Sequence, residues 1–183
     1  TYINRTNHHL TSNTPQSIFE TNPFLLQSNP TLIEYSAFYG SIQIFQYLRL
    51  NNVELTSSLW LYSIHSKSAE LLHLLEENEV PPPGDDYENC LLESIKCHHN
   101  DFANYIKNNL IESKSSESHI KKLIENVFEC SLHFNNYAYF PFDFNIESVF
   151  FNLCFYKYSN LVNSFIQKKK IEFETIVISF NFF

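Results

Sequence analysis

The sequence predicts an all-α fold built from about four to five repeated helix pairs stacked into a solenoid. The first observation is a series of short amphipathic segments, each too small to bury its own apolar face. The second is a small residue that recurs at the same offset from a chain corner in successive segments. The third is composition: 44% of the residues are hydrophobic and 16% aromatic, which is enough for a sizeable core.

The stretch Asn29–Thr56 is the clearest helix pair. We expect Asn29 to cap the first helix and Pro30 to occupy its first position, where no hydrogen bond from a backbone N–H is lost. Gly40 interrupts the apolar pattern, and a second amphipathic helix follows it. A pair of this length needs a similar neighbour to cover its apolar side.

A small residue followed by a corner recurs along the chain. The serines lie 27, 31 and 37 residues apart, which is typical of diverged helical repeats of about 30 residues. A fifth copy has Leu153 in place of the serine. Small residues let neighbouring helices approach closely, so we expect the serines to be buried between helices. The serines are Ser36, Ser63, Ser94 and Ser131, and the corners are Gly40, Lys67, His98, Asn135 and Lys157.

These positions divide the chain into an N-terminal flank and one repeat domain. Residues 1–28 are predicted to form a flank with one or two helical turns, which caps the open face of the first unit. The repeat domain is residues 29–183, with units at about 29–56, 57–88, 89–118, 119–145 and 146–183.

The links between the units contain turn-forming residues. Ser57 is the predicted cap of the helix that follows it, and three prolines end the second unit. Residues 111–118 are predicted to form a mobile polar loop, and residues 137–144 an extended aromatic segment on the surface. The tail, 171–183, is expected to pack on the last pair or to belong to a further repeat.

Charge and composition exclude several classes of function. The net charge is −8 and the basic clusters are small, so nucleic acid is not expected as a partner. Two glycines are too few for phosphate-binding loops, and no apolar run is long enough to span a membrane. Four cysteines without framework spacing predict reduced thiols and a cytoplasmic location. Because no methionine is present, we expect a processed product or a fragment.

The first unit resembles an ankyrin repeat. The run TLIEYSA, Thr31–Ala37, occupies the place of the T-P-L-H-x-A-A pattern, Gly40 that of the corner glycine, and NVELT that of the finger. Residues 22–110, and more loosely 127–171, are similar to a family of ankyrin-repeat proteins from protozoan parasites that carry an uncharacterised ankyrin-like domain. The second and third units lack the corner glycine and the T-P-L-H start. The resemblance implies a protein-binding scaffold without chemistry of its own.

Candidate chemical groups are weighed against structural roles. Cys90, Cys97, His98 and His99 form the densest group, but adjacent residues on a helix point about 100° apart and do not converge on one metal ion. Trp60 aligns with a core position and is expected to pack inside. We therefore predict no catalytic residue, no metal and no cofactor.

The expected function is non-catalytic binding of a protein partner through the concave face. Its acidic character favours a basic or polar partner surface. A structural spacer in a longer chain is one alternative, and a metalloprotein or hydrolase that uses Cys97 and His98 is another. Partner identity and oligomeric state stay open. The predicted partner-binding residues are Glu34, Asn52, Glu54, Thr56, Ser57, Leu61, Asp85, Asp86 and Tyr87.

Overall fold

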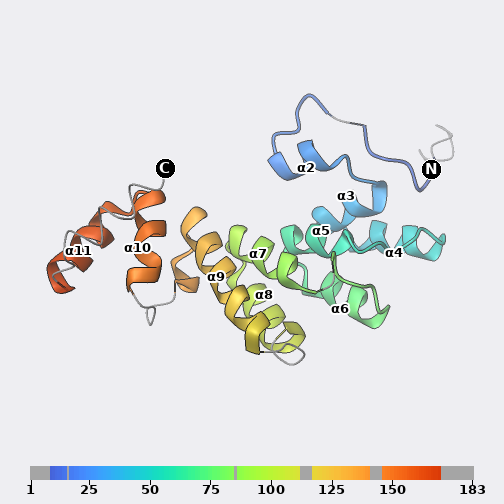
Figure 1. Ribbon diagram of the computed structural model, residues 1–183. Helices are drawn as coiled ribbons and strands as arrows, with labels where there is room; N and C mark the ends of the chain where they lie inside the picture. The colour runs from blue at the N-terminus through green and yellow to red at the C-terminus, as the bar shows by residue number, and fades with distance from the viewer. Residues whose placement is uncertain (1–8, 16, 85, 112–116, 141–145, 170–183) are drawn as a thin grey trace. The chain divides into compact units, whose positions relative to one another are not determined.

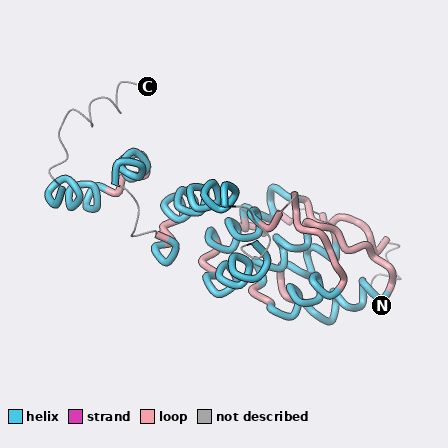
Figure 2. Tube along the Cα trace, turned by 60° about the horizontal axis from the view of Figure 1, so that its bottom comes forward, coloured by secondary structure: helices cyan, strands magenta, loops and turns pink. Residues whose placement is uncertain are grey.

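The computed structural model describes residues 9–15, 17–84, 86–111, 117–140 and 146–169. Within these ranges every regular element is a helix, and Figure 2 shows only helices and loops. A single isolated β-bridge, between Asn13 and Thr31, is the only strand-like pairing among the described residues. The all-α prediction is therefore confirmed for this part of the chain.

The chain divides into two compact units, residues 1–116 and residues 117–183. No helix in the described ranges is long and apolar enough to cross a membrane. The first unit contains α2 (Pro23–Ser28), α3 (Leu32–Phe38), α4 (Ile42–Leu50), α5 (Leu59–Ser66), α6 (Ala69–Glu77), α7 (Glu88–Lys96), α8 (Asn100–Tyr105) and the π-helix η1 (Ile106–Ile111). The second contains α9 (Glu117–His133), the 3₁₀-helix η2 (Tyr137–Tyr139), α10 (Ile146–Phe155) and α11 (Ser159–Lys169).

Helix pairs repeat three times in the first unit (Figure 1). Helices α3, α5 and α7 contact one another in succession, and each also contacts its own partner, α4, α6 or α8. The serine predicted between the helices is buried in each pair, at Ser36, Ser63 and Ser94. Its small side chain lets the first helices of neighbouring pairs pack closely.

Equivalent apolar positions form the core of the three pairs. Each set of positions is spaced by the same 27 and 31 residues as the serines, and every member is at most 2% exposed. Trp60 is one of them, so its predicted packing role is confirmed. The sets are Ile33, Trp60 and Leu91; Ala37, Ile64 and Ile95; Phe45, Leu72 and Ala103; and Leu48, Leu75 and Ile106.

The five predicted corners all have left-handed backbone conformations. Their φ angles are 63° at Gly40, 54° at Lys67, 57° at both His98 and Asn135, and 62° at Lys157. At Gly40 the amide donates to Ala37 O over 3.0 Å, and the next amide donates to Ser36 O over 2.8 Å. This bonding ends a helix in the Schellman manner. The corner prediction is confirmed in both units, although only one corner is glycine.

The second helices share an ending that the sequence analysis did not identify. Asn51, Asn78 and Asn109 each donate a side-chain N–H to the carbonyl four residues earlier, over 2.7, 2.6 and 3.0 Å. A buried aliphatic residue follows each of them two residues later, at Val53, Val80 and Ile111. The side-chain bond is a second one at two of these carbonyls, because Tyr47 O and Leu74 O also accept from the backbone N–H of Asn51 and Asn78, over 3.2 Å each.

Two predicted helix starts are wrong. Thr31, not Asn29, caps α3: the Thr31 hydroxyl accepts from Glu34 N, and the Glu34 carboxylate accepts from Thr31 N. The capping box makes two reciprocal hydrogen bonds at Thr31. Asn29 instead ends α2, in the left-handed conformation at φ 46°. Helix α5 begins at Leu59 after Ser58, so Ser57 is not its cap.

The second unit has a core of its own. Phe128, Leu132 and Leu153 are buried together, and Phe140 and Tyr158 are among the partly buried residues that pack against them. The segment predicted to be extended begins instead as η2, and residues 141–145 lie outside the described ranges. Most of the predicted loop 111–118 and all of the tail 171–183 likewise lie outside the described ranges, and α9 begins at Glu117.

Candidate functional site

The finger residues after α4 form an exposed edge of the first unit. Asn52 has φ 59° and is exposed, as are Glu54 and Thr56, whereas Ser57 is partly buried. Val53 turns inward between them and is 8% exposed. This alternation holds the polar side chains outward. Asp85, from the next finger, lies outside the described ranges.

Glu34 connects this edge to the first helices. Its carboxylate accepts hydrogen bonds from Thr31 N, over 2.8 Å, and from the Ser58 hydroxyl. The Ser58 hydroxyl lies 2.8 Å from the hydroxyl of Thr56. The four residues therefore form a polar chain from α3 to the finger, which places Glu34 and Thr56 on one continuous surface.

The remaining predicted residues are partly engaged in packing. Tyr87 contacts the buried Trp60 ring edge-on, with 5.0 Å between ring centroids, and burial raises the pKa of its phenol. Asp86 accepts a hydrogen bond from Glu88 N over 2.9 Å at the start of α7. Leu61 lies partly buried on α5. Tyr87 therefore has a packing role, and Asp86 a role at the start of α7, whether or not a partner binds.

Helix α2 of the N-terminal flank lies against α3 and α5 (Figure 1). The Phe24 ring has its centroid 6.0 Å from that of Phe38, 5.0 Å from that of Tyr62 and 4.2 Å from that of His65. The neighbouring Leu25 is 3% exposed. The flank thus contacts the first helices of two successive pairs through Phe24.

A cluster of three groups with ligand chemistry lies between α5 and α7. His65 Nε2 is 2.8 Å from Glu93 Oε1, and the Cys97 sulfur is 3.6 Å from His65 Nδ1 and 4.0 Å from Glu93 Oε1. The sequence analysis identified Cys97 but paired it with His98. The available signal was the repeat alignment, which places His65 and Glu93 on adjacent first helices.

Glu93 is held as a carboxylate. Burial alone would raise its pKa, but hydrogen bonds from His65 and Lys96 and the positive charge of Lys96 outweigh burial and lower it. Lys96 Nζ lies 3.0 Å and 3.2 Å from the two carboxylate oxygens. The cluster therefore combines an anion, an imidazole and a thiol.

The other residues of the predicted Cys/His group have separate roles. Cys90 is fully buried, and burial raises the pKa of its thiol to about 12, so it stays protonated. His98 forms the left-handed corner after α7. The His99 Nδ1 atom lies 2.8 Å from Ile64 O. All four cysteines are free thiols.

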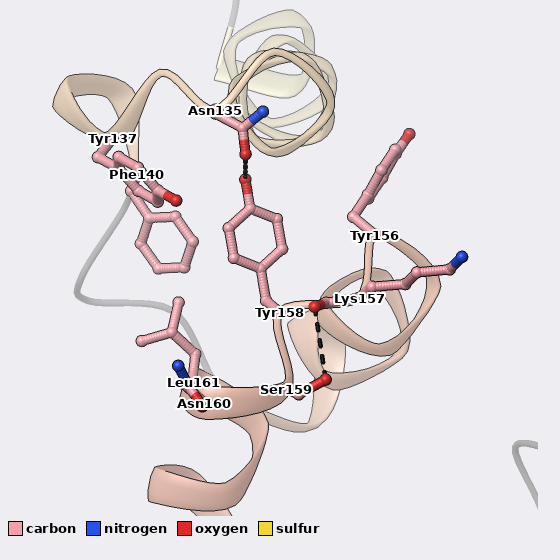
Figure 3. Close-up of a pocket in the computed structure, with 9 residues that line it drawn as sticks. All are labelled: Asn135, Tyr137, Phe140, Tyr156, Lys157, Tyr158, Ser159, Asn160 and Leu161. Carbon is pink, nitrogen blue, oxygen red and sulfur yellow. Dashed lines mark hydrogen bonds between the residues drawn. The ribbon is translucent and has the colours of Figure 1, made fainter.

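The second unit contains a pocket of about 500 Å³ beside its two corners (Figure 3). The Tyr158 hydroxyl lies 2.8 Å from Asn135 Oδ1 and 2.8 Å from Leu132 O. Burial, together with the nearby Tyr137, raises the pKa of Tyr158 to about 12, so this phenol is a hydrogen-bond donor at neutral pH. The lining residues are Asn135, Tyr137, Phe140, Tyr156, Lys157, Tyr158, Ser159, Asn160 and Leu161.

Comparisons with known proteins identify no relative. No family model, no curated protein and no solved structure matches the chain. The functional argument therefore depends on the residues and geometry described above.

Proposed function

We propose that this chain is a non-catalytic interaction scaffold of the ankyrin-repeat type. It binds a protein partner through its first helices and the fingers that link the pairs. The proposal is supported by the three helix pairs of the first unit, which share core positions, corners and helix ends at the same spacing. Its location in the cell is proposed to be the cytoplasm, in keeping with the free thiols.

The docking of α2 is the observation that carries this proposal. A six-residue helix packs on α3 and α5 through a single aromatic anchor, Phe24, whose ring contacts Phe38 and Tyr62. A surface that accepts one helical segment in this way has the chemistry to accept another, because aromatic anchors dominate such interfaces. The exposed Glu54 and the partly buried Glu34 favour a partner with basic or polar residues around its anchor.

Affinity capture with a matched pair of charge variants tests this proposal. The full chain, its Glu54→Lys variant and its Glu70→Lys variant are immobilised, and captured proteins are identified by mass spectrometry. Glu54 lies on the finger and Glu70 on α6, and both are exposed, so the two variants change net charge equally. We expect a captured partner whose recovery falls at least about tenfold with the Glu54→Lys variant and is unchanged with the Glu70→Lys variant.

A structural spacer is the alternative function. A spacer would capture the same proteins whichever glutamate is changed, because it needs no particular surface. Equal capture by both variants would therefore reject the scaffold proposal.

A further inference from the structure

The cluster between α5 and α7 is arranged like part of a metal site. Single ligand atoms of His65, Glu93 and Cys97 all lie within 4.8 Å of one another. Glu93 and Cys97 are four residues apart on the same side of α7, and His65 reaches them from α5. Nitrogen, oxygen and sulfur donors together are the set that zinc uses in proteins.

We infer that His65, Glu93 and Cys97 bind one divalent cation of the zinc class. Tetrahedral zinc with ordinary bond lengths requires donor atoms about 3.3–3.6 Å apart. The observed separations are 2.8 Å from His65 Nε2 to Glu93 Oε1, 3.9 Å from Cys97 Sγ to His65 Nε2, and 4.0 Å from Cys97 Sγ to Glu93 Oε1. Each differs from the required range by about 0.3–0.5 Å. Because Cys97 Sγ lies nearer His65 Nδ1, at 3.6 Å, than Nε2, at 3.9 Å, the imidazole turns on binding so that Nε2 faces the shared ion.

Aromatic rings pack against the imidazole. The centroid of the His65 ring lies 4.2 Å from that of Phe24 and 5.0 Å from that of Phe38. The two helices that carry the ligands are in contact, and the small buried residues Ser63 and Ser94 allow this contact. A ligand set on two packed helices is more rigid than one on loops.

Binding would rearrange the bonds that the cluster makes in this structure. Cys97 would lose its proton to solvent, His65 would bind in its neutral form, and Glu93 Oε1 would exchange its hydrogen bonds for the metal. Lys96 would keep its bond to Glu93 Oε2, at 3.2 Å in this structure. The His65 and Glu93 side chains are 12% and 14% exposed, so solvent can supply a fourth ligand.

Cobalt(II) is the probe that tests the site, because it takes the place of zinc and is coloured when bound. The full-length chain is reduced, freed of metal and titrated with Co²⁺. We expect a thiolate-to-cobalt charge-transfer band and tetrahedral visible bands that saturate at one equivalent and vanish when Zn²⁺ is added. Cys97→Ser and Glu93→Gln should each weaken binding by at least the 10- to 100-fold that is typical of lost supporting contacts.

Two residues that are not part of the ligand set provide matched controls. His98→Ala and Cys130→Ser remove a histidine and a thiol from outside the cluster and should leave the cobalt spectrum unchanged. Circular dichroism of each variant checks that helix content is kept. Absence of the charge-transfer band in the wild type, or its persistence in Cys97→Ser, would overturn the inference.

Lys96 supplies a further test. Its ammonium group repels a cation and competes for Glu93, so Lys96→Gln should bind Co²⁺ more tightly, by about tenfold for a charge at this distance. A structural hydrogen-bond cluster that binds no metal would show no such gain. Weaker cobalt binding by Lys96→Gln would contradict the assigned ligand set.

Discussion

At the scale of single residues, the recurring serine is buried in each of its four copies, and in three of them its hydroxyl bonds within its own helix. Ser36 donates its hydroxyl hydrogen to Ile33 O over 2.7 Å, Ser94 to Cys90 O over 2.8 Å, and Ser131 to Phe128 O over 2.7 Å. Each hydroxyl is thus satisfied within its own helix and can be buried. Ser63 differs, because its buried hydroxyl has no hydrogen-bond partner among the described residues.

The Ser63 position predicts a gain in stability. Replacing Ser63 by alanine removes an unsatisfied buried hydroxyl and should raise the free energy of unfolding by about 1 kcal/mol. Ser94→Ala, which removes a bonded hydroxyl of the same size, is the control and should lower it by about 0.5–1.5 kcal/mol. Urea unfolding followed by circular dichroism measures both. A loss of stability in Ser63→Ala would show that the hydroxyl is satisfied in solution.

Glu93 gives the molecule a defined response to acid. Burial raises the pKa of Glu93, but the hydrogen bonds from His65 and Lys96 lower it by more than burial raises it. The carboxylate form is therefore more favoured in the folded chain than in the unfolded chain. A lowered pKa stabilises the fold above the unfolded value of 4.5, and this contribution is lost as the pH falls through the folded pKa. Glu93→Gln should therefore cost about 1–2 kcal/mol at pH 7.

The difference between wild type and Glu93→Gln should shrink on acidification. Unfolding in urea at about pH 7 and about pH 3, with chelator present, measures it. Glu70→Gln, at an exposed site on α6, is the control and should follow the wild type at both pH values. A difference that stays constant with pH would contradict this account of Glu93.

At the scale of the helices and their connections, corners and caps set where each element ends. The corners use residues as different as Gly40, Lys67 and Asn135 in the same left-handed conformation. Only glycine adopts this conformation without a steric penalty, and other residues lose about 1–2 kcal/mol. The bonds that end the helices offset this loss at the other corners.

Gly40→Ala should lower the free energy of unfolding by about 1 kcal/mol. The added methyl group would lie 3.5 Å from the Ser66 Cβ atom, an ordinary contact, so the loss comes from the backbone conformation alone. Lys67→Ala is the matched control: Lys67 already has the left-handed backbone, so the change should stay within about 0.5 kcal/mol. Thermal unfolding of the two variants compares them. Equal effects would disprove this explanation.

The capping box predicts a difference between two helix starts. Thr31 bonds to the first turn of α3, whereas the Ser41 side chain makes no capping bond to α4. Thr31→Ala should therefore cost about 1 kcal/mol, and Ser41→Ala a few tenths. Denaturant unfolding measures the two. If Ser41→Ala costs as much as Thr31→Ala, the capping bond is not what stabilises α3.

The sequence was sufficient to locate the helix pairs, but not every helix start. The regular spacing of small residues in the sequence located the buried serines, such as Ser36 and Ser63, and the corners, because the same packing recurs in each helix pair. Asn29 and Thr31 are both good caps on propensity, and only the bonds made by Glu34 separate them. Sequence patterns therefore predict which segments are helical better than they predict the residue at which each helix begins.

At the scale of the whole chain, the two units differ in how many helix pairs they contain. Counted over the residues that the structure describes, the unit 1–116 contains three pairs, whereas the unit 117–183 contains α9 with the short η2, followed by the pair α10 and α11. Stacked repeats need about three members to be stable on their own. The first unit meets this requirement and the second does not.

A fragment of residues 1–116 should therefore fold alone. We expect helical circular dichroism and one cooperative urea transition from it, because its core sets are complete. The fragment 117–183 should unfold at a lower urea concentration, measured in the same buffer. Loss of helix in the first fragment would mean that its three pairs need residues beyond 116.

The candidate metal cluster could be only partly predicted, because it joins residues from two repeats. Cys97 and the adjacent His98 attract attention in the sequence, yet a corner conformation separates their roles. His65 is 32 residues from Cys97 and meets it only because α5 packs on α7. The finger residue Glu54, by contrast, lies exposed on an edge that the repeat pattern alone suggested.

The position of Phe24 has a consequence for any measurement of affinity. Helix α2 ends at Ser28 and α3 begins at Leu32, so α2 would act as a tethered competitor, at an effective concentration in about the millimolar range, of any partner proposed for this face. A partner that uses the same face must displace α2. The apparent dissociation constant of that partner rises by the ratio of chains with α2 docked to chains with α2 undocked. Affinities measured with the intact chain would therefore understate how tightly the uncovered helices bind.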